Sequence, residues 1–428
     1  ISACLVGSEM CIRDSESAYE RFVYLDIARA DRHGLYLPFN VLAQPHLRAD
    51  SIASNVREAF HRAWPELATG AATFDTLFVD ASLLLVHNGL SLTALRALLT
   101  NDNFRGYLLG REPDGELVAS FADVYEQFKR KADQVAYAGS VLRRARQLTQ
   151  LDVLRYALGQ RENRLNFRSI MDSGQSVFVK LDVQNDDAKR LMGCFLTVSA
   201  EQAAKSRAEI PAHARRGQHI LVIDECQLFI AQDTSTLDEI LSETRKYGLH
   251  LWMANQTMSQ IPERLRGGLQ NIGLQAVFRV GASDAQYLSE MLAYIDPMKI
   301  KHQVVDEQTV ARTHPVFEHP EEQRLLLAQE MQNFLPGQAY LSWYSPLKNG
   351  LKRAILHRPA MRLVKLKTPR VDEPEHVSSR MQEIEDYYLA EYFRRPEADT
   401  GATPSESPVY TRLFTSTGAK DTEDIDSE

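Results

Sequence analysis

The chain has few cysteines and no long apolar run. Its 428 residues include four cysteines, Cys4, Cys11, Cys194 and Cys226, with no CxxC pair and no spacing typical of metal ligands. A disulfide framework and a zinc site are therefore not predicted, and a reducing, intracellular setting is favoured. No apolar run approaches the roughly 18 residues of a membrane helix. The N-terminus also lacks the basic start and apolar core of a signal peptide.

Positive charge is not in excess. The net charge is −8 at pH 7, which excludes a surface coated with basic residues for nucleic acid but leaves room for a local basic channel. The 12 histidines form no HExxH or HxH set. Apolar residues make up 44% of the chain and charged residues 25%, as in soluble globular proteins, and the length predicts two or three folding units.

The first part of the chain changes pattern twice. Residues 1–15 show neither the period of a helix nor that of a strand. We interpret them as a non-native leader, because they resemble translated adapter read-through. The alternative interpretation is a frayed natural terminus. The stretch Phe22–Leu25 predicts a strand ending at Asp26. Between residues 45 and 165, apolar residues recur at a spacing of three to four, which predicts helices throughout.

From residue 166 the pattern alternates between strands and helices. Near-continuous apolar strands separated by amphipathic helices predict an α/β fold whose parallel sheet is covered on both faces. The expected strands are 176–182, 219–224, 249–254 and 274–280, followed by a strand pair at "QAYLSWY" and "RAILHR" and a charged helix at 376–394. The residues from Arg395 onward are rich in Pro, Ser, Thr and acids and predict a disordered tail.

Two adjacent acids stand at the end of one of these strands. In "HILVIDECQLFI", Asp224 and Glu225 stand where the strand 219–224 ends. In P-loop nucleotidases an acid at this place holds the magnesium shell, and a following Glu can polarise the attacking water as a general base. The alternative interpretation is that Asp224 only caps the segment that follows.

Polar residues near the next strand fit the same chemistry. Asn255 and Gln256 follow the strand 249–254, where a neutral amide can hydrogen-bond a γ-phosphate or its water; both residue types are also common in turns. Arg245 lies at the end of the preceding helix, where the helix dipole favours a cation. An arginine there can also reach a neighbouring subunit's nucleotide and stabilise charge in the transition state.

The stretch from "LVIDECQLF" to "GASDAQYLSEML" resembles the ATPase domains of type IV secretion coupling proteins, the VirD4/TraD/TraG group, and their HerA-like and FtsK-like relatives. The likeness covers roughly residues 20–345, with 219–292 as its strongest part, and includes "LTNDNFRGYLL" and "LNFRSIMDSGQSVFVKLD". The resemblance implies a RecA-like P-loop NTPase fold, namely a parallel sheet with an inserted all-helical domain, and ATP with Mg²⁺ as cofactors.

The resemblance also implies individual roles. Asp224 would organise Mg²⁺ through water, and Glu225 would be the catalytic base. Gln256 would sense the γ-phosphate, and Arg245 would be an arginine finger supplied to the neighbouring subunit. The segment Cys226–Ser235 would face a central pore and contact DNA. Arg279 in "FRVG" could be a second such cation, although a surface arginine at a strand end is the simpler interpretation.

One expected motif is absent from the sequence. The pattern G-x-x-x-x-G-K-[ST], whose backbone amides and lysine hold the β- and γ-phosphates, occurs nowhere, and neither "SGQS" at 173–176 nor "TGAK" at 417–420 replaces it. In the family this loop precedes a strand such as "RFVYLD", so we expect it upstream of Glu16. The printed chain is then expected to bind ATP poorly.

These observations predict an ATP-driven DNA-translocating ATPase. The expected segments are the leader 1–15, the start of the RecA-like domain 16–44, the helical insertion 45–165, the ATPase core 166–360, an extension 361–394 and the acidic tail 395–428. The resemblance implies a ring, expected as a hexamer, that works with DNA, a relaxase and secretion channel proteins. It implies a bacterial cytoplasmic location, with membrane attachment only through an upstream segment. The alternatives are a soluble HerA-like helicase or translocase and a catalytically inactive scaffold of the same fold.

Overall fold

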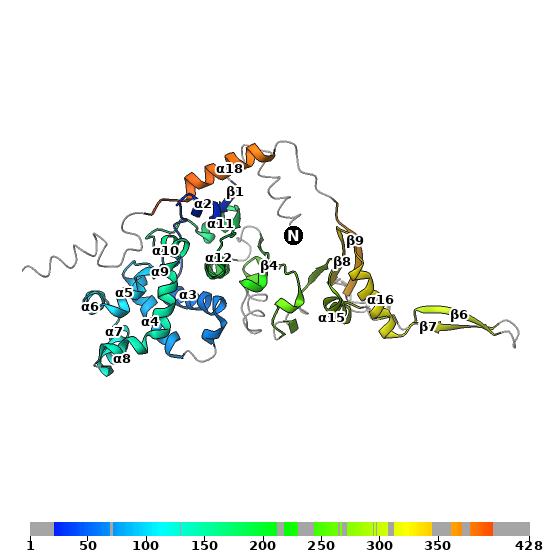
Figure 1. The fold of residues 1–428 in the computed structure, drawn as a ribbon, viewed down its shortest axis with the longest axis horizontal. Coiled ribbons are helices and arrows are strands. Elements are labelled where there is room, and N and C mark those ends of the chain that lie inside the picture. Colours follow the sequence, from blue (N-terminus) through cyan, green and yellow to red (C-terminus); the bar gives the residue numbers. More distant parts are fainter. Residues whose placement is uncertain are drawn as a thin grey trace, which may run out of the picture. The chain divides into compact units, whose positions relative to one another are not determined.

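The computed structural model describes most of the chain in two compact units. The described residues are 21–68, 72–128, 130–211, 218–229, 244–263, 266–267, 272–293, 295–296, 298–306, 312–344, 361–369 and 377–396. With these gaps, the first unit contains residues 21–253 and 377–396, and the second contains residues 254–369. Figure 1 labels the elements of both units.

The first unit begins with a short parallel strand pair. Strand β1 (Phe22–Asp26) pairs with β2 (Ser176–Lys180), with Phe22 opposite Ser176. Asp26 is buried and accepts a hydrogen bond from the backbone N–H of Arg29 at 2.8 Å, which caps helix α2 (Ile27–Arg32). Lys180 Nζ lies 3.1 Å from Asp26 Oδ2. The strand predicted to end at Asp26 is confirmed, and this acid is structural.

Helices alone form the described elements between residues 45 and 160. They are α3 (Ala49–Ala63), η2 (Pro65–Ala68), α4 (Ala72–His87), η3 (Leu92–Ala94), α5 (Leu95–Thr100), α6 (Asp102–Leu109), α7 (Gly115–Gln127), α8 (Lys131–Tyr137), α9 (Gly139–Gln150) and α10 (Asp152–Leu158). The most apolar stretch forms the buried helix α4, in which Phe78 and Leu84 are fully buried. Among the described helices, none has the length and apolar character needed to cross a membrane.

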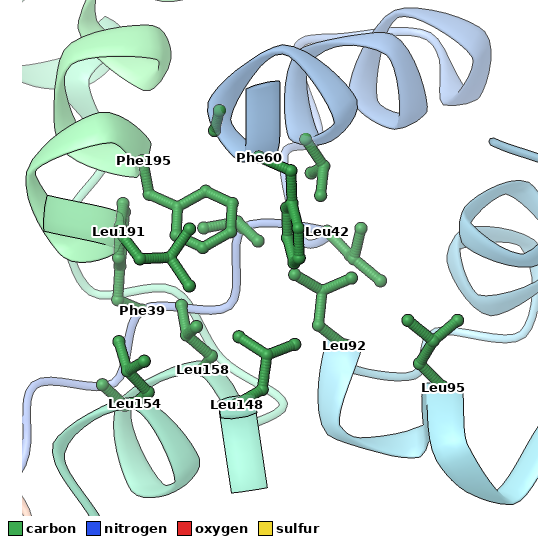
Figure 2. Packing of buried hydrophobic residues seen from close by; sticks show 14 of the residues in the cluster. Phe39, Leu42, Phe60, Leu92, Leu95, Leu148, Leu154, Leu158, Leu191 and Phe195 are labelled. Carbon is green, nitrogen blue, oxygen red and sulfur yellow. The ribbon is translucent and has the colours of Figure 1, made fainter. Parts of the chain in front are cut away.

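A long central helix joins the helical block to the strands. After α11 (Phe167–Ser173) and β2, helix α12 (Asp186–Ser206) begins where the Asn185 side chain accepts the N–H of Ala188 at 2.9 Å. It ends in the short turn η4 (Arg207–Glu209). Figure 2 shows Leu191 and Phe195 of α12 facing Phe60 of α3, and the rings of Phe60 and Phe195 meet edge to face at 5.9 Å. The helical block therefore shares one hydrophobic core with β1 and α12.

The C-terminal helix also packs on this core. Helix α18 (Val377–Tyr392) contacts β1, and the hydroxyl of Tyr388 donates to the backbone oxygen of Phe22. Ile384 is fully buried in the cluster that contains Val23. The charged helix expected at 376–394 is thus present and covers β1, a strand more than 350 residues earlier in the sequence (Figure 1).

A second parallel pair carries the acidic motif. Strand β3 (His219–Ile223) pairs with β4 (Leu249–Met253), with His219 opposite Leu249. Leu249 packs against α11 and α12 through residues that include Met171 and Ala203. On the opposite face the exposed fractions of Ile220, Val222 and Trp252 are 51%, 40% and 47%. In the described residues, helices cover only one face of this pair, whereas the sequence predicts cover on both.

Antiparallel strands dominate the second unit. Its elements are η6 (Met258–Gln260), β5 (Leu274–Val277), α15 (Ala282–Leu292), β6 (Ile300–Asp306), β7 (Arg312–Phe317), α16 (Pro320–Gln332), β8 (Gln338–Tyr344) and β9 (Met361–Lys367). The sheet order is β5-β8-β9, and β6 and β7 form a separate hairpin. Helices α15 and α16 pack on β5 and β8 through Leu288, Met331 and Val277.

The strand arrangement differs from the predicted sheet. Parallel pairing occurs in two separate pairs and not in one continuous sheet among the described residues. The strand expected at 274–280 is shorter and pairs antiparallel with β8, because the hydrophobic pattern specifies burial and not strand direction. Strand β8 pairs with β9 as well as with β5, while the predicted partner "RAILHR" lies outside the described residues, as do residues 1–15 and the tail from residue 397.

Candidate functional site

The acidic pair lies at the carboxyl end of a parallel strand pair. Ile223, the last residue of β3, stands opposite Met253, the last residue of β4. Asp224 and Glu225 follow at once, and the exposed Asp224 side chain lies outside the core. In open α/β sheets, ligands bind in the crevice beyond the carboxyl ends of the strands. The structure therefore places both acids at the end of the strand pair where a nucleotide site is expected.

A left-handed turn fixes the two carboxylates. Glu225 has φ 51° and ψ 44°, and among the described residues it is the one non-glycine with a positive φ. Its backbone N–H donates to Asp224 Oδ1 at 3.0 Å, and its carboxylate accepts a bond from Gln227 Nε2 at 2.6 Å. Non-glycine residues held in this region cost about 1–3 kcal/mol and cluster at functional sites. Gln227, which the sequence analysis did not select, orients the carboxylate of Glu225.

Buried residues after the acids anchor this turn to α12. Cys226 begins η5 (Cys226–Leu228) and is 2% exposed, and burial together with the charge of Asp224 raises the pKa of its thiol to about 12. Phe229 packs directly on the backbone of Gly193, where a Cβ atom would lie 2.3 Å from its ring. A glycine inside a long helix costs about 1 kcal/mol relative to alanine, so Gly193 in "LMGCF" is the sequence signal that could have revealed this close approach.

Gly193→Ala is expected to lower the free energy of unfolding by about 1–3 kcal/mol, because the added methyl group overpacks the contact with the Phe229 ring. Urea denaturation followed by circular dichroism measures the effect. Gly106→Ala in α6 is the matched control, since a Cβ atom there meets nothing within 4 Å. Adding Phe229→Leu to Gly193→Ala should restore part of the loss; no restoration would contradict the assigned contact.

Glu225→Gly is expected to raise the free energy of unfolding by about 0.5–1 kcal/mol, because glycine adopts the left-handed region without the cost that an L side chain bears there. Thermal denaturation detects the change as a rise in Tm. Glu116→Gly, in the first turn of α7, is the control and should lower stability through its helix propensity. A Glu225→Gly variant that is less stable than the parent would show that the turn is not strained.

The structure places Arg245 at the opposite end of the strand pair. The backbone N–H of Gly248 donates to the carbonyl of Arg245 at 3.1 Å, and Gly248 has φ 83°, which ends the helical turn before β4. The five residues of β4, which rise about 3.3 Å each, separate Arg245 at the start of the strand from the acidic pair beyond its end. Arg245 therefore lies roughly 15 Å from Asp224 along the strand direction. The exposed Arg245 is therefore not a ligand of its own chain's acidic pair.

Gln256 falls in the other compact unit. It follows β4 closely in the sequence, and its side chain is exposed. Its neighbour Asn255 donates from Nδ2 to the carbonyl of Thr257 at 2.9 Å, which supports the turn interpretation for Asn255. The predicted γ-phosphate role of Gln256 stays a prediction.

The structure describes only some of the remaining predicted site residues. Of the expected pore segment Cys226–Ser235, the structure describes Cys226–Phe229, of which Phe229 packs on α12 at Gly193, and the rest lies outside the described residues. Arg279 is exposed in the second unit. Within the described ranges, no group of three or more His, Cys, Asp or Glu side chains could hold a metal ion. A single carboxylate such as Asp224 suits Mg²⁺, which keeps most of its water ligands and binds nucleotide phosphates.

Three solved structures align with the chain at low identity. The bacterial conjugative coupling protein TrwB (deltaN70, unbound) aligns over 76% of this chain and 71% of its own, with 18% identity and a TM-score of 0.47. TrwB with the non-hydrolysable ATP analogue ADPNP aligns over 81% and 73%, with 17% identity and a TM-score of 0.46. VirB4 of Thermoanaerobacter pseudethanolicus aligns over 88% and 87%, with 12% identity and a TM-score of 0.47.

TrwB is a conjugative coupling protein, the class of protein that the sequence resembles. No family model and no curated protein matches the chain. Identity and TM-score are low in these matches, so they carry no argument about the function of this chain.

Proposed function

We propose that this chain is the ATPase part of a type IV secretion coupling protein, with a RecA-like P-loop NTPase core that couples ATP hydrolysis to DNA translocation. The observation that carries the proposal is the pair Asp224 and Glu225 at the carboxyl end of β3, held in a left-handed turn that is anchored on α12. A packed anchor beneath an exposed and a half-buried carboxylate is an arrangement that suits a preorganised hydrolytic site.

The two acids have different roles in this proposal. Asp224 Oδ1 accepts the N–H of Glu225, and the same carboxylate would hold a water of the Mg²⁺ shell; the metal neutralises developing charge on the phosphates when bound. Glu225 takes the proton of the attacking water, and Gln227 keeps its carboxylate in place through the bond at 2.6 Å. The buried, neutral thiol of Cys226 takes no part.

The proposed assembly is a homo-oligomeric ring, expected as a hexamer, in the bacterial cytoplasm. The position of Arg245 supports this proposal, because an exposed arginine at the end of β4 away from Asp224 can serve a neighbouring subunit but not its own. DNA is the proposed cargo, and a relaxase and secretion channel proteins are the proposed partners. Gln256 is proposed to contact the γ-phosphate.

DNA-stimulated ATP hydrolysis tests the proposal. Protein expressed from the complete gene, as parent and as Glu225→Gln, is assayed with Mg²⁺ and ATP, with and without DNA. Hydrolysis that DNA stimulates and that needs Glu225 supports the proposal. No hydrolysis at all would favour the inactive scaffold, and translocation by a protein that functions without a secretion apparatus would favour the HerA-like alternative.

A further inference from the structure

A small pocket with a mixed polar and apolar lining lies in the first unit, and neither acid of the pair lines it. Its volume is about 250 Å³, and three segments line it: residues 43–46, residues 161–167, and Ser199 with Ala203 on α12. Two of these segments are joined by backbone bonds between the 38–40 stretch and residues 162–164, including Arg164 N–H to Pro38 O at 2.9 Å. The walls of the pocket are therefore held together before any ligand binds.

Three polar side chains of the pocket each have an oxygen that already accepts a hydrogen bond. Asn163 Oδ1 accepts the N–H of Leu165 at 3.0 Å, and Asn166 Oδ1 accepts the N–H of Ser169 at 3.1 Å. Ser199 Oγ accepts from Gln44 Nε2 at 3.5 Å. Both asparagine amides and the serine hydroxyl keep hydrogens that can still donate. The pocket thus offers hydrogen-bond donors more than acceptors.

His46 adds a half-buried ring whose two nitrogens have no hydrogen-bond partners. Both ring nitrogens are shielded from solvent, and neither has a partner. Burial and the charge of Arg168 lower the pKa of His46, so the ring is neutral at pH 7, while Asp172 and Glu209 act in the opposite direction. An orphaned polar atom is costly unless a ligand or water satisfies it. The neutral ring supplies one further donor.

One acidic and one basic side chain line the pocket, Glu162 and Arg161. Glu162 is bonded to Arg164, whose Nε lies 2.9 Å from its carboxylate. Arg161 is exposed and lines the same pocket, and among the described residues no ion pair neutralises it. A guanidinium with no carboxylate partner, beside several uncommitted donors, suits a ligand that is negatively charged and rich in acceptors.

We propose that this pocket binds a small oxyanion, the carboxylate or phosphate group of a small molecule, with Arg161 pairing its charge and Asn163, Asn166, Ser199 and His46 donating to its oxygens. The volume fits a ligand of roughly eight water molecules in size, at about 30 Å³ for each water. The site is distinct from the Asp224–Glu225 pair and does not depend on the proposed ATPase activity.

Calorimetric titration of the whole chain with inorganic phosphate and with acetate tests the proposal, with potassium chloride at equal ionic strength as the blank. One saturable site is expected, and the tighter of the two probes identifies the anion class. Arg161→Gln should weaken binding about tenfold, since a charge-assisted hydrogen bond is lost, and Ser199→Ala should weaken it several-fold. Arg143→Gln on the exposed face of α9 is the matched control and should change nothing.

A second readout locates the ligand. The histidine ring signals in NMR, with His46 assigned through His46→Gln, should show a rise in the pKa of His46 when the anion binds, because a neighbouring negative charge favours the protonated ring. Binding would then tighten as the pH falls toward the pKa of His46. Saturable binding that responds to Arg161 and Ser199 but not to Arg143 supports the site. No saturable binding of either probe, or equal losses in all three variants, would overturn it.

Discussion

Glu225→Gln is expected to lower kcat for ATP hydrolysis by a factor of about 10²–10⁴, the range over which a positioned general base contributes. Glutamine keeps the shape of the side chain but cannot take the proton of the attacking water. The bond from Gln227 to the side-chain oxygen and the left-handed turn should both survive the exchange. Nucleotide affinity should consequently stay within about a factor of two to three, since binding does not involve this proton transfer.

The measurement is a coupled ATPase assay on protein expressed from the complete gene, with nucleotide affinity measured separately by equilibrium binding. Glu116→Gln makes the same chemical change on the exposed surface of α7 and should leave kcat unaltered. Gln227→Leu should lower kcat about tenfold by releasing the carboxylate of Glu225. Equal turnover by Glu225→Gln and the parent would remove Glu225 from the role of base.

Glu201→Gln is expected to lower the free energy of unfolding of the first unit by about 3–5 kcal/mol, because the buried Arg62 charge loses its buried partner and keeps the partly exposed Glu58. The guanidinium of Arg62 donates to both carboxylate oxygens of Glu201, at 2.9 and 2.8 Å, and the side chains are only 4% and 5% exposed. Burial alone would lower the pKa of Arg62, but Glu201 and Glu58 raise it above its usual range. The pair joins α3 to α12, so it ties the helical block to the strands.

Differential scanning calorimetry should record a fall in Tm of roughly 6–20 °C, at about 2–4 °C for each kcal/mol in a domain of 150–250 residues. The double variant Arg62→Met and Glu201→Met should recover most of the loss, since replacing a buried ion pair by apolar residues is often close to neutral. Asp50→Asn, at the exposed pair of Arg48 and Asp50, is the control and should change stability by less than about 1 kcal/mol. A Glu201→Gln variant as stable as this control would contradict the buried pair.

Several features of the fold could be predicted from local pattern. Strand β1 and its end at Asp26, the buried helix α4 and the charged helix α18 all follow from apolar spacing and composition, which act over a few residues. The acidic pair after β3 was predictable for the same reason, since an apolar run that ends in two acids is readable without any distant contact. The glycine that ends the turn at Gly248 is likewise a local signal.

Strand direction and partner choice depend on the whole chain. The apolar pattern of β5 is compatible with either direction of pairing, and only its contact with β8, more than 60 residues later, makes it antiparallel. The tertiary structure also separates the predicted site residues from one another. Arg245 lies at the far end of β4, and Gln256 belongs to the second unit.

The residues that could do chemistry were recognisable from local pattern, because side-chain type and strand ends are local properties. How those residues are held depends on contacts between distant segments. Gly193 and Phe229 are 36 positions apart in the sequence, and their contact fixes the turn that carries Asp224 and Glu225. Arg62 and Glu201 neutralise each other only because α3 and α12 share one core. Such contacts between distant segments depend on close packing, which a pattern of neighbouring residues does not encode.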